Sequence, residues 1–169
     1  MQDNEEKYQE TFATWNRLAS LYEEKFMDLN LYNTTYDFFC ENIVNENPQI
    51  LELGCGPENI TKYLISKRPD FNIYATDIAP AMIALAQKNN PEAKFELMDS
   101  RNIGALPARF EGIVSGFVIP YLSPQDCMKL IADSYKLLND HGIFYLSFVE
   151  GAPDSSRFLT SGSGEQIFF

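Results

Sequence analysis

The sequence contains few of the residues that hold metal ions or form disulfides. Among its 169 residues there are one histidine and three cysteines. The cysteines, Cys40, Cys55 and Cys127, are not spaced like metal ligands, and their odd number argues against a disulfide framework. We therefore expect reduced thiols and no metal site.

Basic residues are also scarce. The chain has 13 lysines and arginines against 24 aspartates and glutamates, which gives a formal net charge of −11. A protein of this charge repels polyanions, so nucleic acid is not expected as a partner. We interpret the acidity as an aid to solubility; the attraction of a cationic ligand is the alternative.

Long apolar runs are missing as well. No run approaches the roughly 20 residues that span a bilayer, and the N-terminus lacks the basic and apolar regions of a signal peptide. Hydrophobic residues make up 45% and charged residues 22%, which is ordinary for a globular protein. These observations predict one cytoplasmic domain that contacts no membrane.

The first 47 residues are predicted to be helical. Between residues 8 and 26, apolar side chains recur at alternating spacings of four and three, so they share one helical face; they are Tyr8, Phe12, Trp15, Ala19, Tyr22 and Phe26. A similar pattern over residues 33–44 predicts a second helix, with Asn33 as its N-cap.

From residue 48 to residue 150, strand-like and helical segments alternate. Apolar runs of strand length lie at 49–55, 71–77, 93–99, 111–119 and 142–150, and helical patterns at 58–67, 80–89 and 123–138. Such alternation predicts an α/β domain with a mostly parallel sheet and helices on both faces. Residues 151–169, rich in Gly and Ser before an apolar end, are expected to form a loop and an extended piece.

Two glycines and two aspartates end the first three strands. Gly54 and Gly56 follow the first strand, where a parallel sheet binds ligands and where glycine allows a close backbone approach. Asp77 lies 21 residues after Gly56, a spacing that suits an acid binding ribose hydroxyls, and Asp99 ends the third strand. The alternative for each acid is a structural role in a turn or at a helix cap.

Five segments, taken in order, extend this pattern to a family. The sequence resembles the small, single-domain class I S-adenosylmethionine-dependent methyltransferases, which have a Rossmann-like sheet; the segments are ELGCGPEN, YATDIAPAMIALA, FELMDS, FEGIVSGFVIPYLS and LLNDHGIFYLSFVEG. The resemblance covers roughly residues 8–169. It implies S-adenosylmethionine as cofactor and a methyl transfer to a small molecule.

The resemblance implies a role for each matched residue. Those expected at the methionine part of the cofactor are Glu52, Gly54, Cys55, Gly56 and Phe117. Those expected at the ribose and adenine are Asp77, Ile78, Met82, Asp99 and Ser100. Tyr121 would face the substrate as a proton acceptor or orienting group. Tyr8, Trp15 and Tyr22 would belong to an N-terminal helical lid; the alternative is that these aromatic residues are plain core.

The chain departs from the family in two places. Glu58 stands where many members have a third glycine, and we expect its side chain to point outward from the first turn of the helix. Five strands are predicted where members have seven, so the fifth strand would be an open edge that invites self-association. A shortened chain is one explanation; coverage of that edge by residues 157–169, with or without a second copy, is another.

Two other functions stay open. A nicotinamide-dependent oxidoreductase would need a glycine at the position of Asn59. A non-catalytic binding or interaction protein would follow if the missing strands had removed activity. The acceptor, the atom that is methylated and the oligomeric state do not follow from the sequence.

Overall fold

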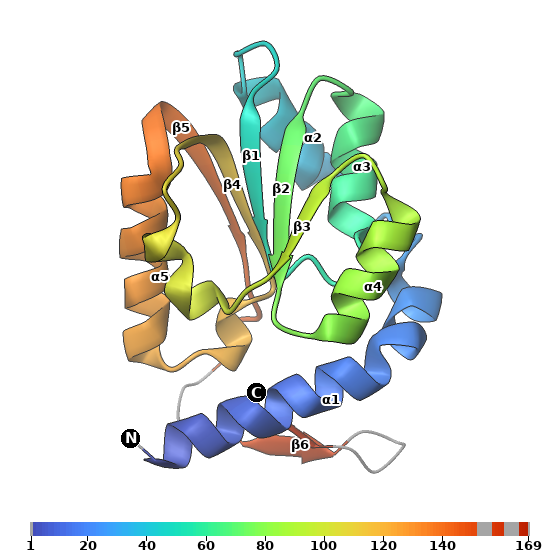
Figure 1. The fold of residues 1–169 in the computed structure, drawn as a ribbon, viewed down its shortest axis with the longest axis vertical. Coiled ribbons are helices and arrows are strands. Elements are labelled where there is room, and N and C mark those ends of the chain that lie inside the picture. Colours follow the sequence, from blue (N-terminus) through green and yellow to red (C-terminus); the bar gives the residue numbers. More distant parts are fainter. Residues whose placement is uncertain (1, 152–156, 161–165, 169) are drawn as a thin grey trace.

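The core of the protein is a five-stranded sheet in which every pair of neighbouring strands is parallel (Figure 1). The computed structural model describes residues 2–151, 157–160 and 166–168. The strand order is β3-β2-β1-β4-β5, with β1 Gln49–Leu53, β2 Asn72–Asp77, β3 Lys94–Leu97, β4 Phe110–Gly116 and β5 Leu138–Ser147. The predicted strands and their parallel pairing are confirmed.

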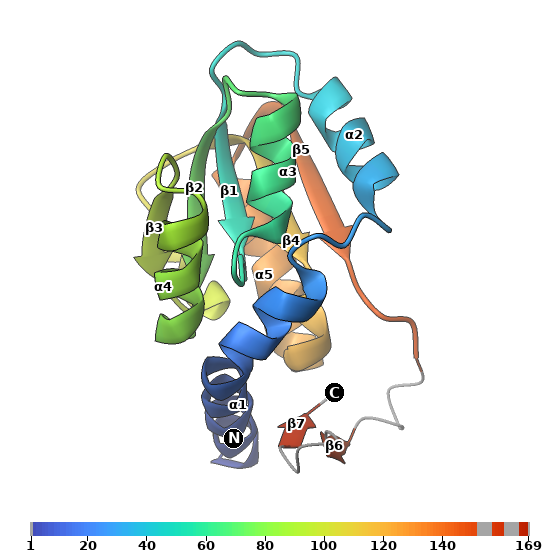
Figure 2. The same cartoon turned by 90° about the vertical axis from the view of Figure 1, so that its right-hand side faces the viewer.

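Helices cover both faces of the sheet. They are α1 Gln2–Phe26, α2 Asn33–Asn42, α3 Asn59–Lys67, α4 Pro80–Asn89 and α5 Pro124–Leu137, with the short 3₁₀ helices η1 Ser100–Ala105 and η2 Ile119–Tyr121. Figure 1 shows α3 and α4 on one side of the sheet and α5 on the other. Helix α1 runs across the end of the sheet toward which the strands point (Figures 1 and 2). The connections between parallel strands carry α3, α4 and α5, as the alternation predicted.

Two helix starts follow their local sequence. Ser123 caps α5 by accepting the N–H of Asp126, and Pro80 is the first residue of α4. The prediction that Asn33 caps α2 is wrong. The carbonyl of Tyr32 already accepts a helical hydrogen bond from the N–H of Tyr36, so the cap position falls on Tyr32 and Asn33 lies inside the helix.

Strand β1 is buried on both faces. Ile50 packs in a cluster with residues of α2 and α3, whereas Leu51 and Leu53 pack in a second cluster with Leu130 of α5; all four are almost fully buried. A strand covered on both faces carries a continuous apolar run. This is why the sequence just before the glycine loop does not alternate between apolar and polar residues.

The last described residues lie near α1 and away from the edge of β5. Strand β6, Phe158–Thr160, pairs with β7, Gln166–Phe168, in an antiparallel hairpin, and β7 packs against α1 (Figure 2). The hypothesis that residues 157–169 cover the β5 edge is therefore wrong for the described part of that segment, because its strands pair with each other. Among the described strands, β5 pairs only with β4.

Within the described ranges, no helix has the length and apolar character needed to cross a membrane.

The close packing of α2 on the sheet leads to a first prediction. A Cβ added at Gly112 of β4 would lie 2.6 Å from Cζ of Phe39 and 3.0 Å from Cδ1 of both Ile43 and Ile50. We expect Gly112→Ala to lower the free energy of unfolding by about 1–3 kcal/mol, measured by urea denaturation, because the core must shift to admit the methyl group. Gly151→Ala is the control, since nothing lies within 4 Å of its added Cβ. Equal stability of the two variants would contradict this packing.

Candidate functional site

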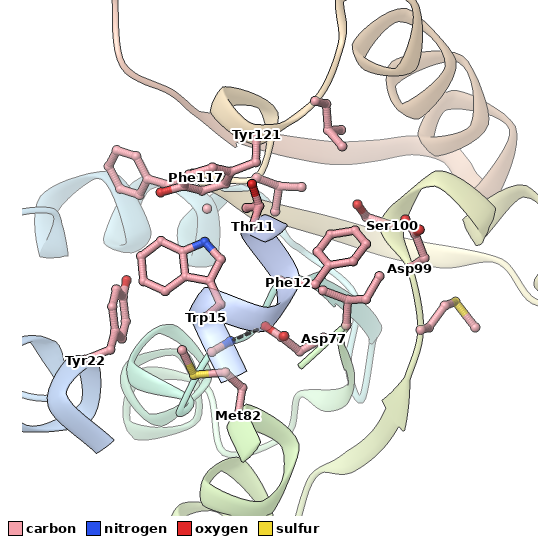
Figure 3. Close-up of a pocket in the computed structure, with 17 residues that line it drawn as sticks. Thr11, Phe12, Trp15, Tyr22, Asp77, Met82, Asp99, Ser100, Phe117 and Tyr121 are labelled. Carbon is pink, nitrogen blue, oxygen red and sulfur yellow. Dashed lines mark hydrogen bonds between the residues drawn. The ribbon is translucent and has the colours of Figure 1, made fainter. Parts of the chain in front are cut away.

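A cavity lies between α1 and the carboxyl ends of the strands (Figure 3). Its walls come from α1, from the loops after β1, β2, β3 and β4, from the first turn of α4 and from η2. The lining residues are Thr11, Phe12, Trp15, Tyr22, Gly54, Gly56, Asp77, Ile78, Met82, Met98, Asp99, Ser100, Gly116, Phe117, Val118, Tyr121 and Leu122. Strands β1 and β4, at which the sheet order reverses, both end here, as expected for a ligand site in such a sheet.

Glycine is required in the loop after β1. Gly54 and Gly56 have φ of +64° and +54°, in the left-handed region that other residues avoid. A Cβ at Gly54 would also lie 2.6 Å from Cγ2 of Val118, so the loop and the η2 segment approach more closely than a side chain allows. Both glycines line the cavity, as predicted.

Asp77 joins this loop to the start of α4. Its Oδ2 accepts the N–H of Gly56 at 3.0 Å, and its Oδ1 accepts the N–H of Ala79 at 2.8 Å. Burial raises the pKa of Asp77, although the N–H groups of Ala79, Gly56 and Ile78 act in the opposite direction by stabilising the carboxylate. Each oxygen of a carboxylate can accept two hydrogen bonds, so Asp77 can still receive donors from a ligand in the cavity.

Asp99 lines the cavity but is also bound to the protein. Its Oδ1 caps η1 by accepting the N–H of Arg101 at 2.8 Å, and its Oδ2 accepts Nε and Nη2 of Arg101 at 2.8 and 2.5 Å. The Arg101 guanidinium lies 4.1 Å from the ring centre of Tyr8 on α1. These contacts fit the alternative that Asp99 has a structural role at a helix cap.

The prediction for Glu58 is wrong. We expected an outward side chain in the first helical turn, but Glu58 is the N-cap of α3 with φ of +81°, and its side chain is fully buried. Asn90 at the end of α4 holds it there, because its Nδ2 donates to the carbonyl of Glu58 at 3.3 Å and to Oε2 at 3.2 Å. The left-handed backbone explains why a glycine suits this position, and Asn90 provides the contacts that keep a larger residue in place.

Glu58 belongs to a buried pair of acids behind the loop. Glu52 is also fully buried, and its Oε2 accepts the hydroxyl of Thr61 on α3. Burial is the main cause of the raised pKa of both acids, which is about 8 for Glu52 and about 9 for Glu58. The charge of Glu52 is a second cause that raises the pKa of Glu58. Oε1 of each acid has no hydrogen-bond partner among the described residues. Neutral, protonated carboxyls are therefore favoured at this place near pH 7.

Two of the three predicted lid aromatics reach the cavity. Trp15 lies in an edge-to-face arrangement with Tyr22 and with Tyr121, with ring centres 5.5 and 5.6 Å apart. Tyr8 does not line the cavity; its hydroxyl donates to Oδ2 of Asp126 at 2.6 Å and accepts the N–H of Ser123 at 2.8 Å. It fastens α1 to the start of α5, which fits the alternative that this residue is structural.

The β4 end supplies Phe117 and Tyr121, both predicted from the sequence. Phe117 has φ of +59° and donates its N–H to the Ser147 carbonyl at 3.1 Å, while its ring packs 5.2 Å from that of Tyr32. Burial raises the pKa of Tyr121 above the usual range of a phenol, so its hydroxyl stays protonated at neutral pH. A protonated phenol can orient a ligand but cannot accept a proton from it.

The remaining predicted residues divide between the cavity wall and the layer behind it. Ile78, Met82 and Ser100 line the cavity, whereas Glu52 and Cys55 are buried and do not line it. Six lining residues were not expected from the sequence: Thr11, Phe12, Met98, Gly116, Val118 and Leu122. Phe12 belongs to the apolar stripe of α1, and the others adjoin selected residues or this stripe. Their position in the sequence was therefore the only sign that they line the cavity.

The buried acids lead to a second prediction. Folded Glu58 keeps its proton until about pH 9, whereas the unfolded chain releases it near the usual value of 4.5. The unfolded state therefore binds fewer protons between these values, and the stability of the protein falls as the pH rises through this window. We expect Glu58→Gln to make this decline shallower, measured as the urea unfolding free energy between about pH 5 and about pH 9.

The matched control is Glu92→Gln, because Glu92 is exposed. It should keep the pH dependence of the native chain. A Glu58→Gln variant with an unchanged decline would show that Glu58 does not hold a proton in the folded state.

Comparisons with known proteins give matches to methyltransferases. The model of the methyltransferase domain family matches residues 50–142, more than half of the chain. A trans-aconitate 2-methyltransferase of Variovorax paradoxus is 41% identical over 54 residues, covering 32% of this chain and 21% of that protein. A putative methyltransferase of Invertebrate iridescent virus 6 is 25% identical over 112 residues, covering 66% of this chain and 40% of that protein. The matches thus span less than half the length of these two relatives.

Solved structures agree on the fold. The DhpI complex with S-adenosylhomocysteine (SAH) has a TM-score of 0.74 at 15% identity and covers 96% of this chain and 78% of that chain. An S-adenosylmethionine-dependent methyltransferase from Clostridium acetobutylicum has a TM-score of 0.61 at 24% identity, covering 78% and 56%. The family match, together with the sheet order and the glycine loop, establishes that this chain belongs to the methyltransferase domain family.

Proposed function

We propose that this chain binds S-adenosylmethionine in the cavity under α1 and transfers its methyl group to a small molecule. The observation that carries the proposal is the meeting of the Gly54–Gly56 loop with the Asp77 carboxylate at the point where the sheet order reverses. Membership of the methyltransferase domain family supports it. The names of the similar structures, one with SAH and one S-adenosylmethionine-dependent, point to the same cofactor.

The residues that would hold the cofactor follow from their places in the wall. Asp77 would accept the ribose hydroxyls, because its oxygens keep free acceptor sites toward the cavity. Ile78 and Met82 would pack against the adenine, and the bare backbone of Gly54 and Gly56 would adjoin the methionine part. Asp99 and Ser100 would lie at the adenine edge, with Asp99 held in place by Arg101.

Glu52 and Cys55 would act from behind the wall. They are buried beside the loop, so we assign them to its support and do not expect them to touch the cofactor. Phe117 would adjoin the methionine part of the cofactor. Tyr121 would face the acceptor side, and Trp15 and Tyr22 would close it as part of the lid.

When bound, the cofactor supplies a methyl group already activated on a sulfonium. The side chains then have to align the acceptor and exclude water, and such alignment alone can lower a barrier by about 7–11 kcal/mol. Tyr121, protonated as argued above, would orient the acceptor through its hydroxyl and would not act as a base. The acceptor would lose its proton to water.

Isothermal titration with SAH tests the proposal. We expect the native chain to bind, and Asp77→Ala to weaken binding by roughly tenfold or more, because hydrogen bonds to a charged group are lost. Asp140→Ala, at an exposed position in β5, should bind like the native chain.

Thermal unfolding shows whether the Asp77→Ala chain is folded under these conditions. If the folded native chain binds neither S-adenosylmethionine nor SAH, the proposal is wrong, and the non-catalytic alternative takes its place.

A further inference from the structure

One side of the cavity is built from aromatic rings of three different segments. Trp15 and Tyr22 come from α1, and Tyr121 from the end of η2; we refer to these three residues as the aromatic box. Figure 3 shows them on one side of the cavity, with Asp99 and Ser100 on the other. Tyr22 and Tyr121 stand at 89° and 75° to the Trp15 ring, so the rings are set across one another and are not stacked. A ring face that is not covered by the edge of a neighbouring ring can attract a cation.

The charges around the cavity also favour a cation. Among the described residues that line it, the charged side chains are Asp77 and Asp99, and no lysine, arginine or histidine is present. Arg101, which pairs with Asp99, reaches Glu5 through Nη1 at 3.2 Å and lies over Tyr8, outside the cavity wall. The whole chain carries a net charge of −11, which adds a negative field.

The negative potential reaches the aromatic box itself. The pKa of Tyr22 is raised mainly by burial and next by the charge of Asp77. The negative potential that disfavours ionisation of the Tyr22 hydroxyl would favour a positively charged group beside it. A ligand carboxylate at the same place would be repelled by the acids of the cavity. No basic residue among the described lining residues would pair with it.

Methyl transfer to an amine keeps one positive charge in the cavity throughout. The lone pair of the acceptor nitrogen forms the new N–C bond, and the electrons of the broken S–C bond stay with the sulfur. The positive charge therefore moves from sulfur to nitrogen, and the nitrogen afterwards gives one proton to water. An acidic, aromatic cavity stabilises the charge at both places, and no protein side chain has to act as a base.

On the basis of the proposed function, we infer that the methyl acceptor is an amine and that the aromatic box holds its nitrogen, which becomes positively charged as the methyl group is transferred. This inference goes beyond the proposed function by naming the chemical class of the acceptor and the residues that select it.

Probes of nearly equal shape but different charge test the inference. Trp15 is the one tryptophan of the sequence, so its fluorescence reports on the box directly. The chain saturated with SAH is titrated with tetramethylammonium chloride, tert-butanol and sodium trimethylacetate, with sodium chloride holding the ionic strength constant. We expect a saturable change with tetramethylammonium and none with the neutral or the anionic probe.

Variants of the box separate ring chemistry from general packing. Tyr121→Leu should weaken tetramethylammonium binding roughly fivefold or more, because one ring face is lost, whereas Tyr121→Phe should keep most of it. Tyr135→Leu is the control, since Tyr135 is 80% exposed on α5 and does not line the cavity. Circular dichroism and SAH affinity establish that each variant is folded.

The outcomes are distinct for the two proposals. Without SAH binding the proposed function fails, and the inference fails with it. SAH binding with no saturable response to tetramethylammonium, or with trimethylacetate bound as tightly, overturns the inference alone. Competition between tetramethylammonium and SAH would place the cation inside the cofactor site and would also overturn the assignment to the acceptor.

Discussion

The carboxylate of Asp77 connects the parts on which the cavity depends. It accepts one N–H from Gly56 in the loop after β1 and another from Ala79 at the start of α4. The segments that follow two neighbouring strands are thereby held together at the cavity, which Asp77 lines. Glycine allows the left-handed turns of this loop, and the carboxylate satisfies the N–H of Gly56.

The layer behind the loop shows how a larger residue replaces a glycine. Glu58 takes up a left-handed backbone and buries its acid next to Glu52, and both acids favour the protonated form. Neutral acids avoid the cost of two buried charges near Asp77. Asn89 and Asn90, at the end of α4, donate to the carbonyls of Pro57 and Glu58, so the helix whose start is held by Asp77 also holds the far side of the loop.

Helix α1 covers this edge of the sheet and forms one wall of the cavity (Figure 1). Tyr8 and Arg101 fasten its first half to the starts of α5 and η1, while Trp15 and Tyr22 reach into the cavity. One helical stripe thus serves two purposes, anchoring and lining, because successive turns lie over different parts of the sheet edge. This helix and Tyr121 supply most of the aromatic rings of the site, whereas its charges come from Asp77 and Asp99.

The sequence by itself determined the alternation of strands and helices, the glycine loop and the acids at the strand ends, because these follow from local periodicity and from backbone conformations that few residues adopt. It did not determine the inward side chain of Glu58, the separation of Tyr8 from Trp15, or the hairpin beside α1. Each of these depends on contacts between residues far apart in the chain: Glu58 with Asn90, Tyr8 with Asp126, and β7 with α1. Only the tertiary structure brings such partners together, so only it decided which predicted residues line the cavity.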